Sequence, residues 1–312
     1  MKYRQDFFHE GELLVQERAG EGARAAQIAA GIADVLVPGA TRFLSTQRMV
    51  AIASLDESGT PWASILLGEP GLIAATGRKS VTVDLAKALV DRADALWSNL
   101  RPGASIGLLA IELATRRRFR INGHVSSVTP APIEVAVDEA FGNCPKYIQS
   151  RRLSQSGQSA ADVEVAAGTA LDAARLQLIA RSDTFFVASQ HAARGLDVSH
   201  RGGEPGFVRV LDPSTLRVPD YPGNSLFQTL GNLAIAPAAG LAILDFDRAR
   251  LLQLSGEVTL RLDLPDDPVQ PSGGTGRYWD FAVSRWIERP LPGRVRWQLV
   301  DRSPYNPEPS GG

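Results

Sequence analysis

Short runs of Val, Ile, Leu and Phe recur along the chain, and turn-forming residues such as Asp-Glu-Ser-Gly at 56–59 and Gly-Glu-Pro-Gly at 68–71 interrupt them. Short apolar runs between turn signals are typical of strands joined in a meander or a small barrel. A closed barrel leaves no sheet edge exposed. The pattern therefore predicts a mainly β protein with helices, of the α+β class.

Apolar residues at helical spacing predict helices at 21–36, 83–100, 163–181 and 226–236. The segment 153–160 is rich in Ser, Gln and Gly, a composition typical of linkers. A chain of 312 residues is long enough for two domains that each bury a core. We therefore expect an N-terminal domain at 1–160, which includes a helical N-terminal extension, and a C-terminal domain at 161–312.

The two expected domains match each other in sequence. Residues 49–73 lie over residues 184–208 without a gap, so that Ser64 falls on Ser199 and both copies of Gly-Glu-Pro-Gly coincide. Further on, residues 105–125 lie over 239–258, with only a small change in the offset. Matching blocks in the same order indicate an internal duplication. The sequence therefore predicts two barrels in tandem.

The two copies differ at matched positions. The first copy has the apolar segment 65–67, whereas the second has His200, Arg201 and Gly202. Together with Ser199, they offer a hydroxyl group, a guanidinium group and accessible backbone N–H groups, which are the groups that bind phosphate. The alternative is a polar turn at the rim of a barrel with an exposed arginine.

Polar side chains also surround the start of the expected helix 226–236, namely those of Asn224, Ser225, Gln228, Thr229 and Asn232. A helix N-terminus offers unpaired N–H donors and a positive dipole end to an anion. N-capping by Asn224 or Ser225 explains one or two of these residues without a ligand. A second half of an anion site explains more of them.

Four stretches resemble the pyridoxamine 5′-phosphate oxidase-like flavoproteins: RMVAIASLDESGTPWAS (48–64), FGNCPKYIQSRRL (141–153), LDVSHRGGEPGFV (196–208) and DYPGNSLFQTLGNL (220–233). The resemblance implies tandem split β-barrels of the FMN-binding type, with FMN as cofactor. It implies an oxidoreductase with an unknown small-molecule substrate or electron partner. In this family the neighbouring barrel completes the site, usually across a homodimer interface, so a homodimer is one option and a site within one chain is the other.

The resemblance assigns residues to two parts of the cofactor site. The second copy supplies the phosphate and ribityl contacts through Ser199, Arg201, Gly202, Asn224, Thr229 and Asn232. His200 is either a further cofactor contact or a turn residue. The segment 141–152, expected to begin a helix, supplies contacts from the first copy through Lys146, Tyr147, Gln149 and Arg151, and its alternative is a solvated basic helix end. No residue is identified as a catalytic acid or base.

The chain departs from the family pattern after Gly223 and Asn224, where basic residues are frequent but Ser225 and Leu226 stand here. Arg201 is therefore the main local cation. The run 115–120 places Arg116, Arg118 and Arg120 on one face of an expected strand, from which one arginine can reach the cofactor. Such a run is otherwise simply solvated.

Composition excludes several other classes. The 33 basic and 34 acidic residues nearly cancel, so no overall field recruits nucleic acid or an anionic membrane. The single cysteine, Cys144, excludes an intramolecular disulfide framework, fits a reducing cytoplasm and leaves a redox role open. One cysteine and four scattered histidines show no zinc-site spacing, and we expect no metal.

Two other functions remain open at this point. The first is a flavin- or ligand-binding module without catalytic activity. The second is a heme-binding or heme-degrading split barrel, in which His124, His191 or His200 would supply the axial ligand. The absorption spectrum of the purified protein separates a flavin from a heme.

Overall fold

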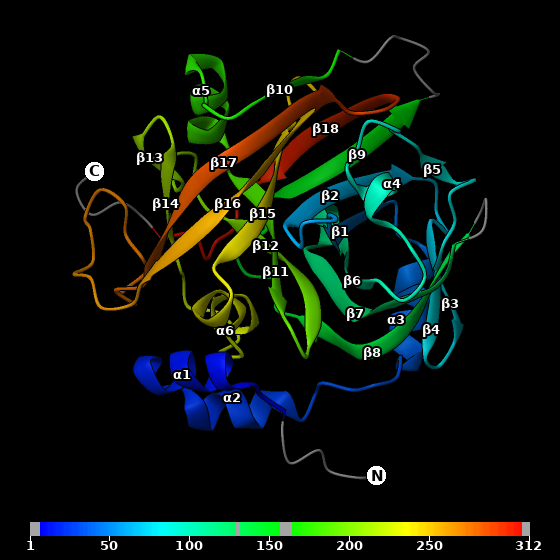
Figure 1. Cartoon of the computed structure of the whole chain (residues 1–312), viewed down its shortest axis with the longest axis horizontal. Helices are drawn as coiled ribbons and strands as arrows, with labels where there is room; N and C mark the ends of the chain where they lie inside the picture. The colour runs from blue at the N-terminus through cyan, green and yellow to red at the C-terminus, as the bar shows by residue number, and fades with distance from the viewer. Residues whose placement is uncertain (1–6, 129–131, 157–163, 308–312) are drawn as a thin grey trace.

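The computed structural model describes residues 7–128, 132–156 and 164–307, and two large antiparallel sheets dominate it (Figure 1). The first sheet has the order β3-β4-β8-β7-β6-β1-β2-β5. Its strands are β1 Met49–Leu55, β2 Pro61–Gly68, β3 Ile73–Gly77, β4 Ser80–Val83, β5 Ala88–Leu89, β6 Ser105–Glu112, β7 Arg117–Val128 and β8 Ile133–Asn143. The predicted class, mainly β with helices, is confirmed.

The second sheet repeats this arrangement. Its order is β12-β11-β15-β16-β17-β14-β13, which is the order of the first sheet read from the other edge and without β5, when strands are taken by their order along each half. Its strands are β11 Thr184–His191, β12 Gly195–Gly202, β13 Arg209–Asp212, β14 Thr215–Pro219, β15 Ala238–Asp245, β16 Arg250–Arg261 and β17 Tyr278–Pro290, with β10 Ala166–Gly168 paired to β17. The strands β6 and β7 begin 133 positions before β15 and β16, because 238 − 105 and 250 − 117 are both 133.

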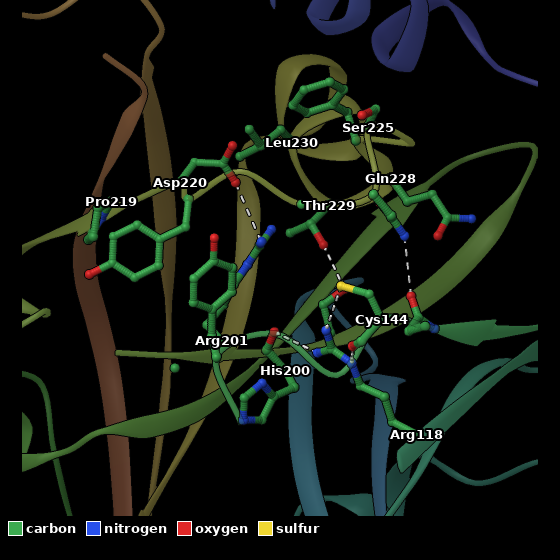
Figure 2. Close-up of a pocket in the computed structure, with 18 of the residues that line it drawn as sticks. Arg118, Cys144, His200, Arg201, Pro219, Asp220, Ser225, Gln228, Thr229 and Leu230 are labelled. Carbon is green, nitrogen blue, oxygen red and sulfur yellow. Dashed lines mark hydrogen bonds and ion pairs between the residues drawn. The ribbon is translucent and has the colours of Figure 1, made fainter. Parts of the chain in front are cut away.

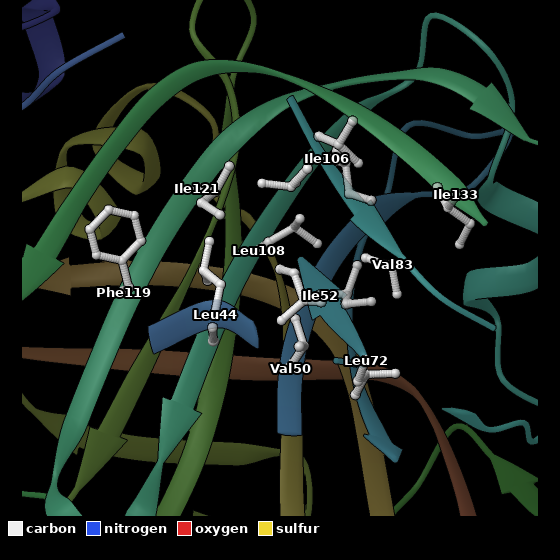
Figure 3. Packing of buried hydrophobic residues seen from close by; sticks show 14 of the residues in the cluster. Leu44, Val50, Ile52, Leu72, Val83, Ile106, Leu108, Phe119, Ile121 and Ile133 are labelled. Atoms are coloured by element: carbon white, nitrogen blue, oxygen red, sulfur yellow. The ribbon is translucent and has the colours of Figure 1, made fainter. Parts of the chain in front are cut away.

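Three large apolar clusters and a small one around Ala29, Phe141 and Leu226 hold the described part of the molecule together. One fills the first sheet around Ile52, Leu108 and Ile121 (Figure 3), and a second fills the other sheet. The third lies between the two sheets and joins apolar side chains of β1 and β2 to those of β11 and β12, such as Ile65 and Val198. Burying this apolar surface favours a fixed contact between the halves.

A small third sheet ties the two halves together. It pairs β9 Ser150–Ser156 with β18 Arg294–Asp301, so the end of the chain returns to the first half (Figure 1). The expected linker at 153–160 is therefore corrected in part, because residues 153–156 belong to β9. Residues 157–160, and with them the expected domain boundary between 160 and 161, lie outside the described residues.

Helices flank the sheets at the bounds α1 Glu10–Ala19, α2 Gly22–Ala29, α3 Pro38–Ser45, α4 Leu96–Asn99, α5 Ala173–Arg181 and α6 Gln228–Ile235, with the 3₁₀ turn η1 Leu113–Thr115. The helix predicted at 226–236 is confirmed as α6. The one predicted at 163–181 begins only at α5, after Asp172 accepts a bond from the Arg175 N–H group as an N-cap. None of the helices in the described residues is long and apolar enough to cross a membrane.

The helix predicted at 83–100 is wrong, since only α4 is helical there. The carboxylates of Asp84, Asp91 and Asp94 accept hydrogen bonds from backbone N–H groups two residues later. Such bonds compete with helix formation and favour turns. The predicted helix start at 141–152 is also wrong, because β8 runs to Asn143 and β9 begins at Ser150.

Candidate functional site

A cavity opens beside the second sheet at the junction of the two halves (Figure 2). We call it the anion cavity. The second half contributes the end of β12, the loop between β14 and α6, and the first turn of α6, while the first half contributes β7 and the loop after β8. Its lining includes Arg118, Arg120, Asn143, Cys144, Tyr147, Ser199, His200, Arg201, Gly202, Asp220, Tyr221, Asn224, Phe227, Gln228 and Thr229.

Three arginines converge on this cavity. Arg120 is buried and pairs with Asp197 at 2.9 Å, and it also donates to Ser199 and Gln228. Arg201 lies 3.4 Å from Asp220, which also pairs with Arg277. The cavity thus gathers guanidinium groups from strands of both halves, which is the composition of an anion site.

Arg118 is the third of them and differs in its partners. Its Nε donates to the Cys144 carbonyl oxygen at 2.9 Å, and Nη1 donates to the His200 carbonyl oxygen at 3.4 Å. Among the described residues, no carboxylate forms an ion pair with it. Burial lowers the pKa of Arg118 to about 10. Of the three arginines, Arg118 is therefore the one whose positive charge no carboxylate of the described residues balances.

Several donors around the cavity lack acceptors within the protein. Arg120 Nε, Arg201 Nε and Asn143 Nδ2 are buried and have no hydrogen-bond partner. A buried polar group without a partner costs about 1–3 kcal/mol, and unpaired donors of this kind are rare in folded proteins. Three of them around one cavity indicate that a ligand supplies the missing acceptors.

The first turn of α6 adds backbone donors. Phe227 precedes the helix with φ at 57° and makes no side-chain cap bond. The N–H groups at the start of a helix have no partner within the helix and carry its positive dipole end. Thr229, in this first turn, also donates its hydroxyl hydrogen to Ser199 Oγ at 2.9 Å. This end of α6 therefore suits an anion.

Backbone strain is concentrated at the same place. Tyr147, Ser225 and Phe227 have φ values of 65°, 62° and 57°, and all three line the cavity. Positive φ is disfavoured for residues other than Gly, and such residues cluster at functional sites. Ser225 is held in place by Glu21, whose carboxylate accepts from the Ser225 hydroxyl.

Aromatic rings form one wall of the cavity. Tyr147 and Tyr221 lie 5.0 Å apart in a tilted arrangement, and the Tyr147 hydroxyl donates to the Pro222 carbonyl oxygen at 2.9 Å. Burial raises the pKa of Tyr147 to about 12 and also raises that of Tyr221, so both are neutral at physiological pH. The wall can therefore cover a planar group next to the arginines.

The structure brings seven of the eleven residues named from the sequence to the anion cavity: Ser199, His200, Arg201, Gly202, Asn224, Thr229 and Tyr147. The His200 ring is buried, both of its nitrogens lack partners, and it lies across β12 from the Arg201 guanidinium (Figure 2). Burial and the neighbouring arginines hold the pKa of His200 well below its usual value. Gly202 has no Cβ atom, which allows the Tyr147 carbonyl oxygen to approach its backbone. A Cβ atom at this position would lie 2.1 Å from that oxygen.

The other four lie elsewhere. Asn232 is one turn further along α6 and bonds to Ser189 and His9. Lys146 lies over the Tyr305 ring at 5.5 Å. The other two are buried in contacts within the protein: Gln149 bonds to the Gly203 carbonyl oxygen and Asn306, and Arg151 pairs with Asp183 at 2.6 Å.

The sequence predicted that one arginine of the run 115–120 can reach the cofactor, without saying which one. Arg118 and Arg120 line the cavity from β7, and Arg116 precedes the strand and pairs with Asp301 at 2.8 Å. The alternation of a strand was the available signal for the first two. Asp220 and Tyr221 begin the stretch 220–233 that carries the resemblance, but the sequence assigned no contact to either of them.

The region of the first half that corresponds to the anion cavity is filled by a buried arginine side chain from β17. Arg289 is 1% exposed and lies between Asp91 and Asp94, with which it forms ion pairs. Ser64, the match of Ser199, donates to Asp94 Oδ1 at 2.6 Å. Two carboxylates and a buried guanidinium thus occupy the place where the second half has an arginine-rich cavity.

One cluster has the residue types of a metal site. Ligand atoms of His9, Glu10 and His191 lie within 4.8 Å of one another. However, His9 Nδ1 accepts from the Gly11 N–H group and its Nε2 pairs with Asn232, and both ring nitrogens of His191 are hydrogen-bonded as well. A metal ion would have to displace these bonds.

The histidines considered as heme ligands do not share a cavity. His124 is half-exposed and lies 3.3 Å from Asp138, and His191 is stacked on His9 at 4.1 Å. Of the three, His200 alone lines the anion cavity, among arginines.

The chain matches no family model and no curated protein. Among similar solved structures is a candidate pyridoxamine 5′-phosphate oxidase from Lactobacillus delbrueckii, at 14% identity and TM-score 0.31, over 38% of this chain and 93% of that one. A FAD-binding protein from Mesorhizobium loti has 9% identity and TM-score 0.29, over 41% of this chain and 97% of that one.

A third similar structure, from Clostridium acetobutylicum, is described as related to general stress protein 26 and as a member of the pyridoxinephosphate oxidase family. It has 9% identity and TM-score 0.24, over 39% of this chain and 89% of that one. Two of these three solved structures thus carry names from the family that the sequence resembles.

Proposed function

We propose that this protein is a flavoprotein that binds FMN in the anion cavity and acts as an oxidoreductase on a small molecule. The observation that carries the proposal is the convergence of Arg118, Arg120 and Arg201 with buried N–H donors that lack acceptors. A phosphomonoester offers several strong acceptor oxygens and is the ligand that such a donor set fits.

The charges of the cavity support a phosphate. Around the cavity, the described residues place four guanidinium groups, those of Arg118, Arg120, Arg201 and Arg277, against three carboxylates, those of Asp197, Asp220 and Glu21. Four positive against three negative charges leave one positive charge in excess, before the start of α6 is counted. A phosphomonoester carries about 1.5–2 negative charges at pH 7 and is attracted to such an excess.

The residues of the chain would bind and orient the cofactor. The arginines and the first turn of α6 hold the phosphate, and the Tyr147 and Tyr221 rings cover the adjacent wall. The flavin, when bound, supplies the electron-transfer chemistry. Because Arg118 and Arg120 come from the first half and Ser199 and Arg201 from the second, we infer that one chain supplies both barrels of a site that arose by internal duplication.

Arg201→Ala tests the assignment of the phosphate. We expect it to weaken FMN binding by about 1.5–3 kcal/mol, roughly 10- to 150-fold in Kd, since a hydrogen bond to a charged group is lost. Fluorescence titration of FMN measures the change. Arg209→Ala is the matched control, because Arg209 is half-exposed and pairs with Asp267 away from the cavity. Unchanged affinity in Arg201→Ala would remove this residue from the site.

We expect one flavin per chain. The matched region of the first half contains Asp91 and Asp94, whose carboxylates repel a phosphate, and the guanidinium of Arg289 already pairs with both. Flavin absorbance divided by protein mass, measured after reconstitution with excess FMN and gel filtration, gives the ratio. A ratio near two would show that the first half also has a phosphate site.

A further inference from the structure

A second, smaller cavity lies next to the anion cavity and has the opposite character. We call it the acidic cavity, and its lining includes the carboxyl groups of Glu12, Glu139 and Asp197 and the amide of Asn122. Gln228 lines both cavities. The cavity measures about 20 Å³, which is enough for one group of the size of a water molecule.

Asn122 gives the first indication of a ligand. Its Oδ1 atom is buried and has no hydrogen-bond partner, and the residue is 5% exposed. Its Nδ2 donates weakly to Glu139 Oε2 at 3.5 Å, which fixes the amide so that Oδ1 is the free acceptor. Asn122 continues the row of Arg118 and Arg120 along β7, on the same face by the alternation of a strand.

Glu12 gives the second indication. It is 4% exposed, and its carboxylate accepts from the His9 N–H group at 2.9 Å. No Lys or Arg of the described residues forms an ion pair with it. Burial lowers the pKa of the nearby His9 to about 4, so this imidazole is neutral and gives Glu12 no positive charge.

The charged groups that act on Glu12 in the described residues come from β8, β12 and the turn before β12, while α6 adds only the amides of Gln228 and Asn232. Glu139 on β8 and Asp197 on β12 add negative charge, Arg194 in the turn before β12 adds positive charge, and Arg120 pairs with Asp197. Burial, together with the neighbouring carboxylates, raises the pKa of Glu12 to about 8, so the empty cavity keeps this group protonated at neutral pH.

We propose that the acidic cavity binds one cation of the ammonium type, either a free ion or the amino group of a molecule that also enters the anion cavity. An ammonium group has three N–H donors and no acceptor, which suits Asn122 Oδ1 and the carboxylates of Glu12 and Glu139. Ca²⁺ and Mg²⁺ need about six to eight oxygen ligands, and the Arg194 side chain and the amide N–H groups in the lining work against such an ion.

Calorimetric titration of the full chain with methylammonium chloride tests the proposal. We expect saturable binding, and no binding of tetramethylammonium, which has the same charge but no N–H donor. Glu12→Gln and Asn122→Leu should each weaken methylammonium binding at least ~10-fold, since the first removes the negative charge beside the cation and the second removes an acceptor of its N–H groups. Glu10→Gln is the matched control, because Glu10 lies on the same helix with a side chain 66% exposed.

Proton release provides a readout that a structural role would not give. At pH 7 about nine-tenths of Glu12 is protonated when its pKa is about 8, and a cation beside it favours the ionised form. Titration in two buffers of different ionisation enthalpy should therefore show release of nearly one proton at pH 7 and little at pH 9. Glu12→Gln should abolish this release while its unfolding midpoint stays at or above that of the parent.

A series of aminoalkyl phosphates separates the two sources of the cation. If one of them binds more tightly than both methylammonium and inorganic phosphate, and Glu12→Gln removes the gain, one molecule spans both cavities. If none does, the cation is a separate ion. Absence of methylammonium binding, binding equal to that of tetramethylammonium, or binding unchanged in Glu12→Gln and Asn122→Leu would overturn the proposal. The methylammonium titration contains no flavin or phosphate, so its result is independent of FMN binding.

Discussion

Replacing Arg289 by Met should lower the free energy of unfolding by about 3–5 kcal/mol, the cost of removing one partner from a buried ion-pair network. The Arg289 side chain is 2% exposed and pairs with Asp91 and Asp94, and its Nη1 donates to Gln253. Without the guanidinium, the carboxylates of Asp91 and Asp94 lose their paired positive charge, although each keeps a backbone N–H donor, and the Gln253 amide oxygen loses a donor. Urea unfolding of the full chain at pH 7, followed by circular dichroism, measures the change.

Arg285→Met is the control on the same strand. Its side chain is 54% exposed and lies 3.5 Å from Asp56, so we expect a change below about 1 kcal/mol. Adding Asp94→Asn to Arg289→Met should restore part of the loss, because it removes one of the unpaired charges. Equal effects of Arg289→Met and Arg285→Met would show that the network does not stabilise the fold.

The same network explains why the two halves differ in their capacity to bind an anion. Gln253 stands 133 positions after Arg120, in the matching strand, and its Nε2 donates to Ser64 Oγ at 3.1 Å, whereas Arg120 donates to Ser199. The guanidinium of Arg289, which reaches the first half from β17, is neutralised inside the protein. The guanidinium groups of Arg118, Arg120 and Arg201 line an open cavity instead, so their excess charge is available to a ligand.

The presence of strands in both halves was predictable from the sequence because it depends on local apolar runs and turn signals. The failure at 83–100 has a local cause as well, since Asp84, Asp91 and Asp94 bond to nearby N–H groups in turns. Helical spacing of apolar residues carries no information about such side-chain bonds. The pairing of β9 with β18 joins residues about 140 positions apart, and no local pattern encodes it.

In the candidate site as well, residues with a local sequence signal were predictable, whereas positions that depend on long-range contacts were not. His200, Arg201 and Gly202 were recognised because they replace the apolar segment 65–67 of the other half, next to Ser199, which matches Ser64. The position of Asn232 depends on contacts with His9, which is 223 residues away and has no motif. Likewise, Gln149 bonds to Gly203 and Asn306, and Arg151 pairs with Asp183, all of them far away along the chain. Long-range contacts of this kind decided which polar residues reach the cavity.

Arg118→Met should weaken FMN binding by about 2–4 kcal/mol, roughly 30- to 1000-fold in Kd, because it removes a partly buried charge that has no carboxylate partner among the described residues. The same change should leave the free energy of unfolding of the ligand-free protein unchanged or higher. Burial depresses the pKa of Arg118 to about 10, which means that folding disfavours its charged form, and Met removes that penalty while keeping most of the apolar stem. Fluorescence titration and urea unfolding of the same preparation measure both quantities.

The opposite signs of these two effects distinguish a binding residue from a structural one. Arg117→Met is the matched control, because Arg117 neighbours Arg118 on β7 but lies over the Phe43 ring on the opposite face, at 4.8 Å. It should leave FMN affinity unchanged and lower stability by no more than about 1 kcal/mol, the value of an exposed cation–π contact. If Arg118→Met lost stability and kept its affinity for FMN, Arg118 would serve to anchor the loop after β8 through Cys144. The charge of Arg118 would then have a structural role, and the case for one chain supplying both sides of the flavin site would rest on the other first-half residues of the cavity, Arg120, Asn143 and Tyr147.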